Sequence, residues 1–364
     1  MGGGYLGLGI FQFPRELVDF AGPDAGWAFL LICLGFLGLL MLFLKVAAID
    51  PDHALGYTLR RLLSPMVGWP LDAFRIVLHF MLAVLVVANF GQVMRSFFLI
   101  GTPAWAIEAV LVATSLYTAW YGTAVLARTI EAIFVPTLIG SIAIGALVVH
   151  QLRFRWAILP TGHLAVTPTL LAAYHSAYIF IGFEVLAQAY GHVRVDRRPA
   201  ARRWLFILFA TTVVFFAFGY VVTMGTEGPS ALATMQWPPV SALRLANISG
   251  FFISKLGLLV VVLWGLFAMA FISIRFWCLA HDVGAKTYRV VPPTRYHGAL
   301  IGVAVVVFAG AQGFRTVVGV VHVFQTWGLP IMMGYLVGLP ALLLPAAWWR
   351  DRRAEHKASE KAPM

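Results

Sequence analysis

Apolar stretches of about 20 residues recur along almost the whole chain, from Gly3 to Trp349. At 1.5 Å per residue, a helix of that length crosses a hydrocarbon layer of about 30 Å. Of the 364 residues, 61% are hydrophobic and only 11% are charged, which leaves too little polar surface to cover a water-soluble globule. The stretches therefore indicate membrane-spanning helices, and the alternating strands of a membrane barrel do not recur.

The hydropathy pattern predicts an all-α membrane protein of about ten transmembrane helices. The apolar segment Thr316–Trp327 is expected at the outer membrane interface, although it leaves an eleven-span count as the alternative. The ten expected spans are Gly3–Phe20, Ala25–Ala48, Leu71–Phe97, Ala104–Tyr121, Thr129–Val149, Thr169–Tyr190, Trp204–Thr226, Phe251–Ala280, Thr294–Gly313 and Gly328–Trp349.

The formal net charge of +11 comes from basic residues in short loops and not from a patch on a soluble domain, so no nucleic-acid partner is expected. These residues are distributed asymmetrically, which predicts that both termini are cytoplasmic. The expected outer side holds only Arg15, Arg95, Arg153, Arg155, Arg244 and Arg315. The expected inner side holds Arg60, Arg61, Arg128, Arg194, Arg197, Arg198, Arg202, Arg203, Lys286, Arg289, Arg295, Arg350, Arg352, Arg353, Lys357 and Lys361.

The chain has the organisation of one transmembrane domain over residues 1–350, followed by a charged cytoplasmic tail over residues 351–364. Ten spans can divide into halves of about 1–150 and 168–350. Because each half has an odd number of spans, the second half would enter the membrane inverted, as in a 5+5 inverted repeat. A short amphipathic segment after Pro51 predicts an interfacial helix in the inner loop that follows the second span.

Two spans carry glycine-rich interruptions, and each is the first span of its half. Gly7 and Gly9 precede Pro14 in the first span, and Gly182 lies in the sixth span. A broken helix in lipid leaves backbone groups that a ligand or an ion must satisfy, and this arrangement suits a carboxylate together with an ammonium group. The alternative is that the glycines only allow close helix packing. The candidate ligand-binding residues at the two breaks are Gly7, Gly9, Ile10, Tyr178, Phe180, Gly182 and Glu184.

Glu184 lies well inside the sixth span, where an ionised carboxylate usually faces a cavity, a partner or a proton path. The alternative is a structural hydrogen bond to a neighbouring span. Arg128 and Glu131 are expected to form an ion pair within the fifth span. The histidines have no metal-ligand spacing, and no nucleotide-binding or hydrolase motif occurs. We therefore expect no metal, no cofactor and no enzymatic activity.

Several short motifs follow one another along the chain. They are Gly7-Leu8-Gly9-Ile10 with Pro14, Ala21-Gly-Pro-Asp-Ala-Gly-Trp27, Thr102-Pro-Ala-Trp105, Gly122, Leu126-Ala-Arg128 with Glu131 and Pro136, Gly182-Phe-Glu184, and Phe252-Ile-Ser-Lys-Leu-Gly257 with Trp264. In this order and spacing they resemble the GerAB-type spore germination permeases of the amino acid/polyamine/organocation transporter superfamily. The chain departs from that family at Lys255 and Gly257, where the family usually has Arg and Asp, and at Leu8, where it has Thr.

The resemblance implies a leucine-transporter-type inverted-repeat fold, with an amino-acid-like pocket between the first, third, sixth and eighth spans. It also implies assembly with an A-type membrane subunit and a C-type lipoprotein in the spore inner membrane. The leading hypothesis is a nutrient-sensing receptor subunit. The alternatives are an ion-coupled amino acid permease in which Glu184 takes part in proton coupling, and a structural or channel-lining subunit without a ligand. Fold alone does not separate these three.

Overall fold

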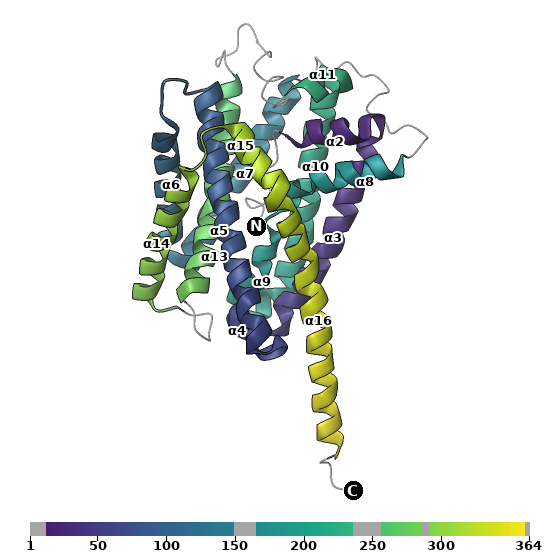
Figure 1. The fold of residues 1–364 in the computed structure, drawn as a ribbon, viewed down its shortest axis with the longest axis vertical. Coiled ribbons are helices and arrows are strands. Elements are labelled where there is room, and N and C mark those ends of the chain that lie inside the picture. The colour runs from purple at the N-terminus through teal and green to yellow at the C-terminus, as the bar shows by residue number, and fades with distance from the viewer. Residues whose placement is uncertain (1–11, 149–164, 236–255, 285–290, 361–364) are drawn as a thin grey trace.

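The computed structural model describes residues 12–148, 165–235, 256–284 and 291–360, which form helices joined by turns and contain no β-strand. The predicted all-α class is therefore confirmed for the described residues. Most of the helices run side by side along the long axis of the molecule (Figure 1). The main helices are α2 (Phe13–Ala21), α3 (Ala25–Ile49), α4 (Leu55–Leu63), α5 (Pro65–Phe97), α6 (Ala104–Trp120), α7 (Gly122–Val148), α8 (Val166–His175), α9 (Leu186–Ala189), α10 (Arg198–Glu227), α11 (Pro229–Thr234), α13 (Leu256–Gly284), α14 (Pro293–Ala311), α15 (Val317–Val323) and α16 (Leu329–Glu360).

Seven described helices are long and apolar enough to cross a membrane, and a bent helix pair makes an eighth. The apolar helix α6 is shorter, with 17 residues, and packs against α5. Of the first predicted span, only the part in α2 is described. These findings establish an integral membrane protein of many helices, whereas the count of ten stays a prediction.

The last membrane helix begins earlier than the hydropathy pattern indicates. A five-residue π-helix (Phe324–Gly328) joins α15 directly to α16, and one candidate span covers Val317–Arg353. This segment is therefore continuous with the last candidate span and forms no separate span among the described residues, while its expected location at the outer interface stays a prediction. The segment continues as helix because its apolar side chains Val317, Val320 and Phe324 pack into the core.

The helix α4 forms where the sequence predicts a helix, but it packs against protein and does not lie free in the interface. Its residues Leu55 and Leu59 are buried in the core, beside α5 and α16. The polar side is also held, because Arg60 forms an ion pair with Asp72 of α5 at 3.1 Å. Gly68 of α5 lies directly against the α4 backbone, since a Cβ added there would be 2.5 Å from the Cα atom of Arg60.

Replacing Gly68 with alanine is expected to destabilise the protein by about 1–3 kcal/mol, because the added methyl group meets backbone atoms that cannot move independently. The measurement is the free energy of unfolding in detergent micelles. Gly38→Ala is the matched control, because Gly38 lies in helix α3 with nothing within 4 Å of an added Cβ. That control should be neutral or slightly stabilising. Equal effects of the two substitutions would contradict the close α4–α5 contact.

Exposed tryptophans mark both ends of the helical bundle, as expected for a protein in contact with membrane lipid. Trp27 and Trp105 lie near the starts of α3 and α6, at the end of the bundle that also carries α11 (Figure 1). Trp69 and Trp204 lie near the starts of α5 and α10, at the opposite end beside α4. Tryptophan is enriched at the two membrane–water interfaces, so these side chains delimit the lipid-facing zone.

Candidate functional site

The predicted break in the sixth span is present in the structure. Helix α8 ends at His175, and short 3₁₀ turns at Ala177–Phe180 and Phe183–Val185 carry the chain through the break. The two sides of the break differ in direction by 44°. Gly182 lies between the turns with φ 139°, a conformation that side-chain-bearing residues rarely adopt. The glycine of the Gly-x-Glu sequence is thus required by the backbone geometry of the break.

Glu184 stabilises the break and also carries a charge that must be neutralised. Its Oε2 atom accepts a hydrogen bond of 2.7 Å from the backbone amide of Gly182, which satisfies one group released by the broken helix. Its Oε1 atom forms an ion pair with Arg275 of α13. Both side chains are at most 1% exposed. Each of the two buried groups thus has a partner of opposite charge within the membrane-spanning bundle.

Arg275 joins the break to α5 as well. One guanidinium nitrogen lies 2.7 Å from Nδ1 of His79, and the guanidinium also lies over the Phe271 ring at 4.7 Å. Because an arginine side chain can only donate hydrogen bonds, Nδ1 of His79 must accept, which places the histidine proton on Nε2. His79 is therefore neutral in this arrangement, and its Nδ1 atom satisfies a donor of the buried cation.

A second set of buried charges lies next to this pair, toward α4. Arg75 of α5 donates to Asp72 at 2.7 Å and to Asp282 of α13 at 2.6 Å. Gln188, just past the break, also donates to Asp282. The charged side chains of both sets are thus paired across α5, α13 and the break of the sixth span. We call the whole set the buried ion network, which consists of Asp72, Arg75, His79, Glu184, Gln188, Arg275 and Asp282.

Tyr178 faces a small cavity on the other side of the break. The cavity has a volume of about 20 Å³, and Asn89 of α5 and Phe324 of the π-helix also line it. The Asn89 Oδ1 atom is buried without a hydrogen-bond partner among the described residues, whereas the Tyr178 hydroxyl interacts with the carboxyl group of Glu16 on α2. The Tyr178 and Phe324 rings meet edge to face, with centroids 5.5 Å apart. This space accommodates about one water molecule.

Phe180 points into a different environment. Its ring packs against Phe36 of α3 and against Phe209 and Phe216 of α10, with centroids 5.1–5.7 Å apart. The structure therefore places Tyr178 beside a cavity and Phe180 in an aromatic core cluster. The remaining candidates Gly7, Gly9 and Ile10 lie outside the described residues.

The part of the first span that is described, helix α2, lies directly against the upper half of the break. Gln325 of the π-helix donates to Glu16 of α2 at 2.8 Å, and its Oε1 atom lies 3.2 Å from Nδ1 of His175. The Phe20 ring stacks on His175 with centroids 4.4 Å apart. The end of the first span, the break and the π-helix thus form one contact region.

The sequence pattern indicated Glu184, but it did not indicate the other charged residues of the buried ion network. Arg275, Arg75 and Asp72 all fall within predicted spans, and charges at such positions are themselves a signal for a functional or structural site. The expected Arg128–Glu131 ion pair is wrong, because both side chains are exposed and form no such pair in the structure. No group of three or more potential metal ligands occurs among the described residues.

These observations define an integral membrane protein built as a helical bundle, with one span broken at a glycine and stabilised there by buried ions. The chain belongs to the spore germination permease family, whose model, described as "Spore germination protein", matches residues 3–312. The resemblance seen in the sequence motifs is therefore confirmed.

Three relatives from Bacillus subtilis (strain 168) are similar over much of their length, each at 22% identity. Spore germination protein B2 aligns over 71% of this chain and 70% of its own length. Spore germination protein YndE aligns over 81% of this chain and 80% of its own. Spore germination protein KB aligns over 97% of this chain and 95% of its own, so the similarity extends nearly from end to end.

Proposed function

We propose that the chain is the B-type subunit of a spore germinant receptor, located in the spore inner membrane, and that it senses a small amino-acid-like nutrient at the breaks of the first and sixth spans. The observation that carries this proposal is the interruption of a buried helix at Ser176–Gly182, beside the buried Asn89 Oδ1 atom, which has no hydrogen-bond partner among the described residues. Released backbone groups and unpartnered side chains inside a membrane protein favour a ligand that satisfies them.

In this proposal, the Tyr178 hydroxyl and the Asn89 side chain contact the nutrient directly. Glu184 instead keeps the break in place, because its two oxygens already bind the Gly182 amide and Arg275. A cavity of about 20 Å³ is too small for an amino acid, so binding requires the contact region around Phe324 to open. The π-helix at Phe324–Gly328 is a suitable hinge, since π-turns often occur at functional sites.

The proposed topology has ten spans in a 5+5 inverted repeat, with both termini in the cytoplasm. It is supported by the shared position of the basic segments. The C-terminal part of α16, with Arg352 and Arg353, extends from the end of the bundle that carries α4, with Arg60 and Arg61 (Figure 1). The proposed partners are an A-type membrane subunit and a C-type lipoprotein, as the family resemblance implies.

A genetic experiment tests the receptor role. Spores of the native host that lack this chain should form normally but lose germination in response to one class of nutrient. Re-expression of the wild-type chain should restore that response, whereas Tyr178→Phe should require about two- to tenfold more nutrient, since it removes one hydrogen bond to the ligand. Tyr117→Phe is the matched control, because Tyr117 is exposed on α6. Normal nutrient responses in the deletion strain would contradict the proposed role.

An ion-coupled permease is the alternative, and the observation that favours it is the buried carboxylate of Glu184 at the break. Uptake of a labelled amino acid into vesicles that contain the purified chain separates the two functions. A receptor subunit predicts no accumulation, whereas a permease predicts accumulation that a protonophore abolishes.

A further inference from the structure

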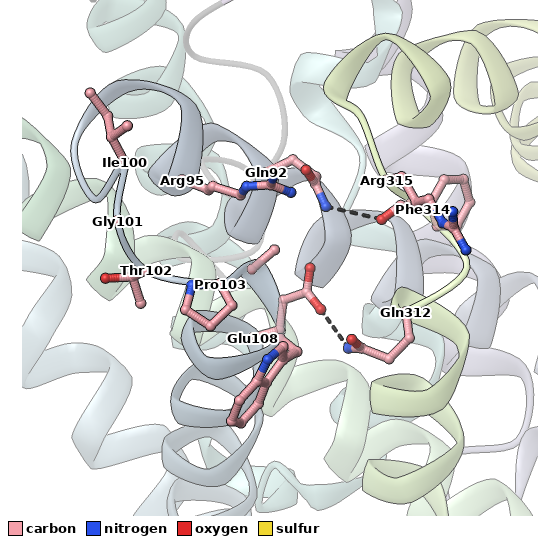
Figure 2. Close-up of a pocket in the computed structure, with 12 residues that line it drawn as sticks. Gln92, Arg95, Ile100, Gly101, Thr102, Pro103, Glu108, Gln312, Phe314 and Arg315 are labelled. Carbon is pink, nitrogen blue, oxygen red and sulfur yellow. Dashed lines mark hydrogen bonds between the residues drawn. The ribbon is translucent and has the colours of Figure 1, made fainter.

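A larger cavity lies away from the break, at the end of the bundle opposite α4 (Figure 1). Its volume is about 570 Å³, within the range of small-molecule binding sites, and it is formed by the ends of α5 and α6 and by the turn after α14. We call it the outer cavity. Its polar lining residues are Gln92, Arg95, Thr102, Glu108, Gln312 and Arg315 (Figure 2).

Glu108 places a buried carboxyl group at the outer cavity. The side chain is 1% exposed, and its Oε2 atom accepts a hydrogen bond of 2.5 Å from Gln312. Its Oε1 atom has no hydrogen-bond partner, and no cation pairs with the carboxylate, among the described residues. Gly91 of α5 makes room for this group, since a Cβ added to Gly91 would overlap the carboxylate. A buried carboxylate in this position favours a cationic ligand.

Arg95 and Arg315 supply the opposite charge at the same cavity. Both are exposed, and neither forms an ion pair or a side-chain hydrogen bond with another described residue. In Figure 2, Glu108 lies on one side of the cavity, and Arg95 and Arg315 lie above it at the rim. Two guanidinium groups suit a carboxylate, which they can bind through paired hydrogen bonds. The cavity therefore presents separate positions for a cation and for an anion.

We propose that the outer cavity binds a small zwitterion with an aliphatic side chain, with its ammonium group on Glu108 and its carboxylate on Arg95 and Arg315. Ile100, Pro103 and Trp105 add an apolar wall for the side chain. This site shares no lining residue with the small cavity at Tyr178, so the inference does not depend on where the proposed function places its ligand. In the proposed topology this end of the bundle faces the outside, from which a nutrient would arrive.

The test measures equilibrium binding of radiolabelled leucine to the detergent-purified full chain. Unlabelled leucinamide, which lacks the carboxylate, and N-acetylleucine, which lacks the ammonium charge, compete with the label. Each is expected to bind at least about tenfold more weakly than leucine, because each loses one charge-assisted contact. Competition by either compound at the affinity of leucine would contradict zwitterion recognition.

Variants then assign the binding to the outer cavity. Glu108→Gln keeps the shape of the side chain, and it should weaken leucine binding at least about tenfold, as should the double variant Arg95→Gln/Arg315→Gln. Glu131→Gln is the matched control, because this exposed glutamate of α7 lines neither cavity, and it should bind like the wild type.

Two results would overturn the inference. The first is the absence of saturable leucine binding by a wild-type sample that shows a cooperative melting transition. The second is wild-type affinity in both Glu108→Gln and Arg95→Gln/Arg315→Gln. If the outer-cavity variants kept wild-type affinity and Tyr178→Phe weakened leucine binding, the result would support the broken-helix pocket of the proposed function and contradict the outer-cavity site. If only the outer-cavity variants weakened binding, the outer site would be supported and the pocket location in the proposed function would fail.

Discussion

Replacing Arg275 with methionine is expected to destabilise the protein by about 3–5 kcal/mol, because it leaves the buried carboxylate of Glu184 without its cation. The substitution also removes the hydrogen-bond donor to Nδ1 of His79. The free energy of unfolding can be measured in mixed detergent micelles by following tryptophan fluorescence. Arg128→Met is the matched control, because Arg128 is exposed on α7, and its effect should be within about 0.5 kcal/mol.

A second substitution shows whether the loss comes from the unpaired charge. The double variant Glu184→Gln/Arg275→Met removes both charges, and the glutamine oxygen can still accept from the Gly182 amide. It should therefore recover most of the stability that Arg275→Met loses, since replacing both members of a buried ion pair is often close to neutral. A double variant no more stable than Arg275→Met would contradict the assignment of this ion pair.

The second large effect is expected at Arg75. Arg75→Met leaves two carboxylates on neighbouring helices, Asp72 and Asp282, without the cation between them. Asp72 keeps its ion pair with Arg60, and Asp282 keeps its hydrogen bond with Gln188. The expected loss is again about 3–5 kcal/mol, because a buried like-charge pair adds repulsion to the desolvation of each carboxylate.

A second substitution, Asp282→Asn, tests whether the stability lost in Arg75→Met can be restored. In the Arg75→Met background it should restore part of the stability, because it removes one of the two negative charges and keeps an acceptor for Gln188. The same unfolding measurement applies. If Asp282→Asn lowered the stability of Arg75→Met further, the charge-balance explanation for this half of the buried ion network would fail.

The positions of most helices could be predicted from the sequence because each apolar stretch is a local property of the chain. The predicted ends of the helices were less accurate than their positions, because a helix can continue through polar residues beyond the hydrocarbon zone. Helix α10 begins at Arg198, ahead of the expected start at Trp204, and α16 continues to Glu360. The break in the sixth span was predicted, because Gly182 is a local signal for an unusual backbone conformation.

The partners within the site could not be predicted, because they depend on which helices are neighbours. Arg75 and Asp282 are 207 positions apart in the chain, and no local pattern links them. The outer cavity is a similar case, since Glu108 meets Gln312 across 204 positions. Charged residues inside predicted spans do mark candidates, but the structure is needed to pair them. For the same reason, Tyr178 and Phe180, two positions apart, were both candidates, although Tyr178 lines the small cavity and Phe180 packs among aromatic rings.

The most direct test of the central claim is the melting temperature of the purified protein with a panel of amino acids, sugars and nucleosides. A ligand that binds only the folded state raises this temperature. The account predicts that one amino acid raises it in the wild type and in Glu108→Gln. In the Glu108→Gln background, in which the outer cavity no longer contributes, the rise should be much smaller with Tyr178→Phe and absent with Gly182→Leu, in samples shown to be folded. A rise of the same size in both break variants, or no rise with any compound in the folded wild type, would contradict a nutrient pocket at the broken helices.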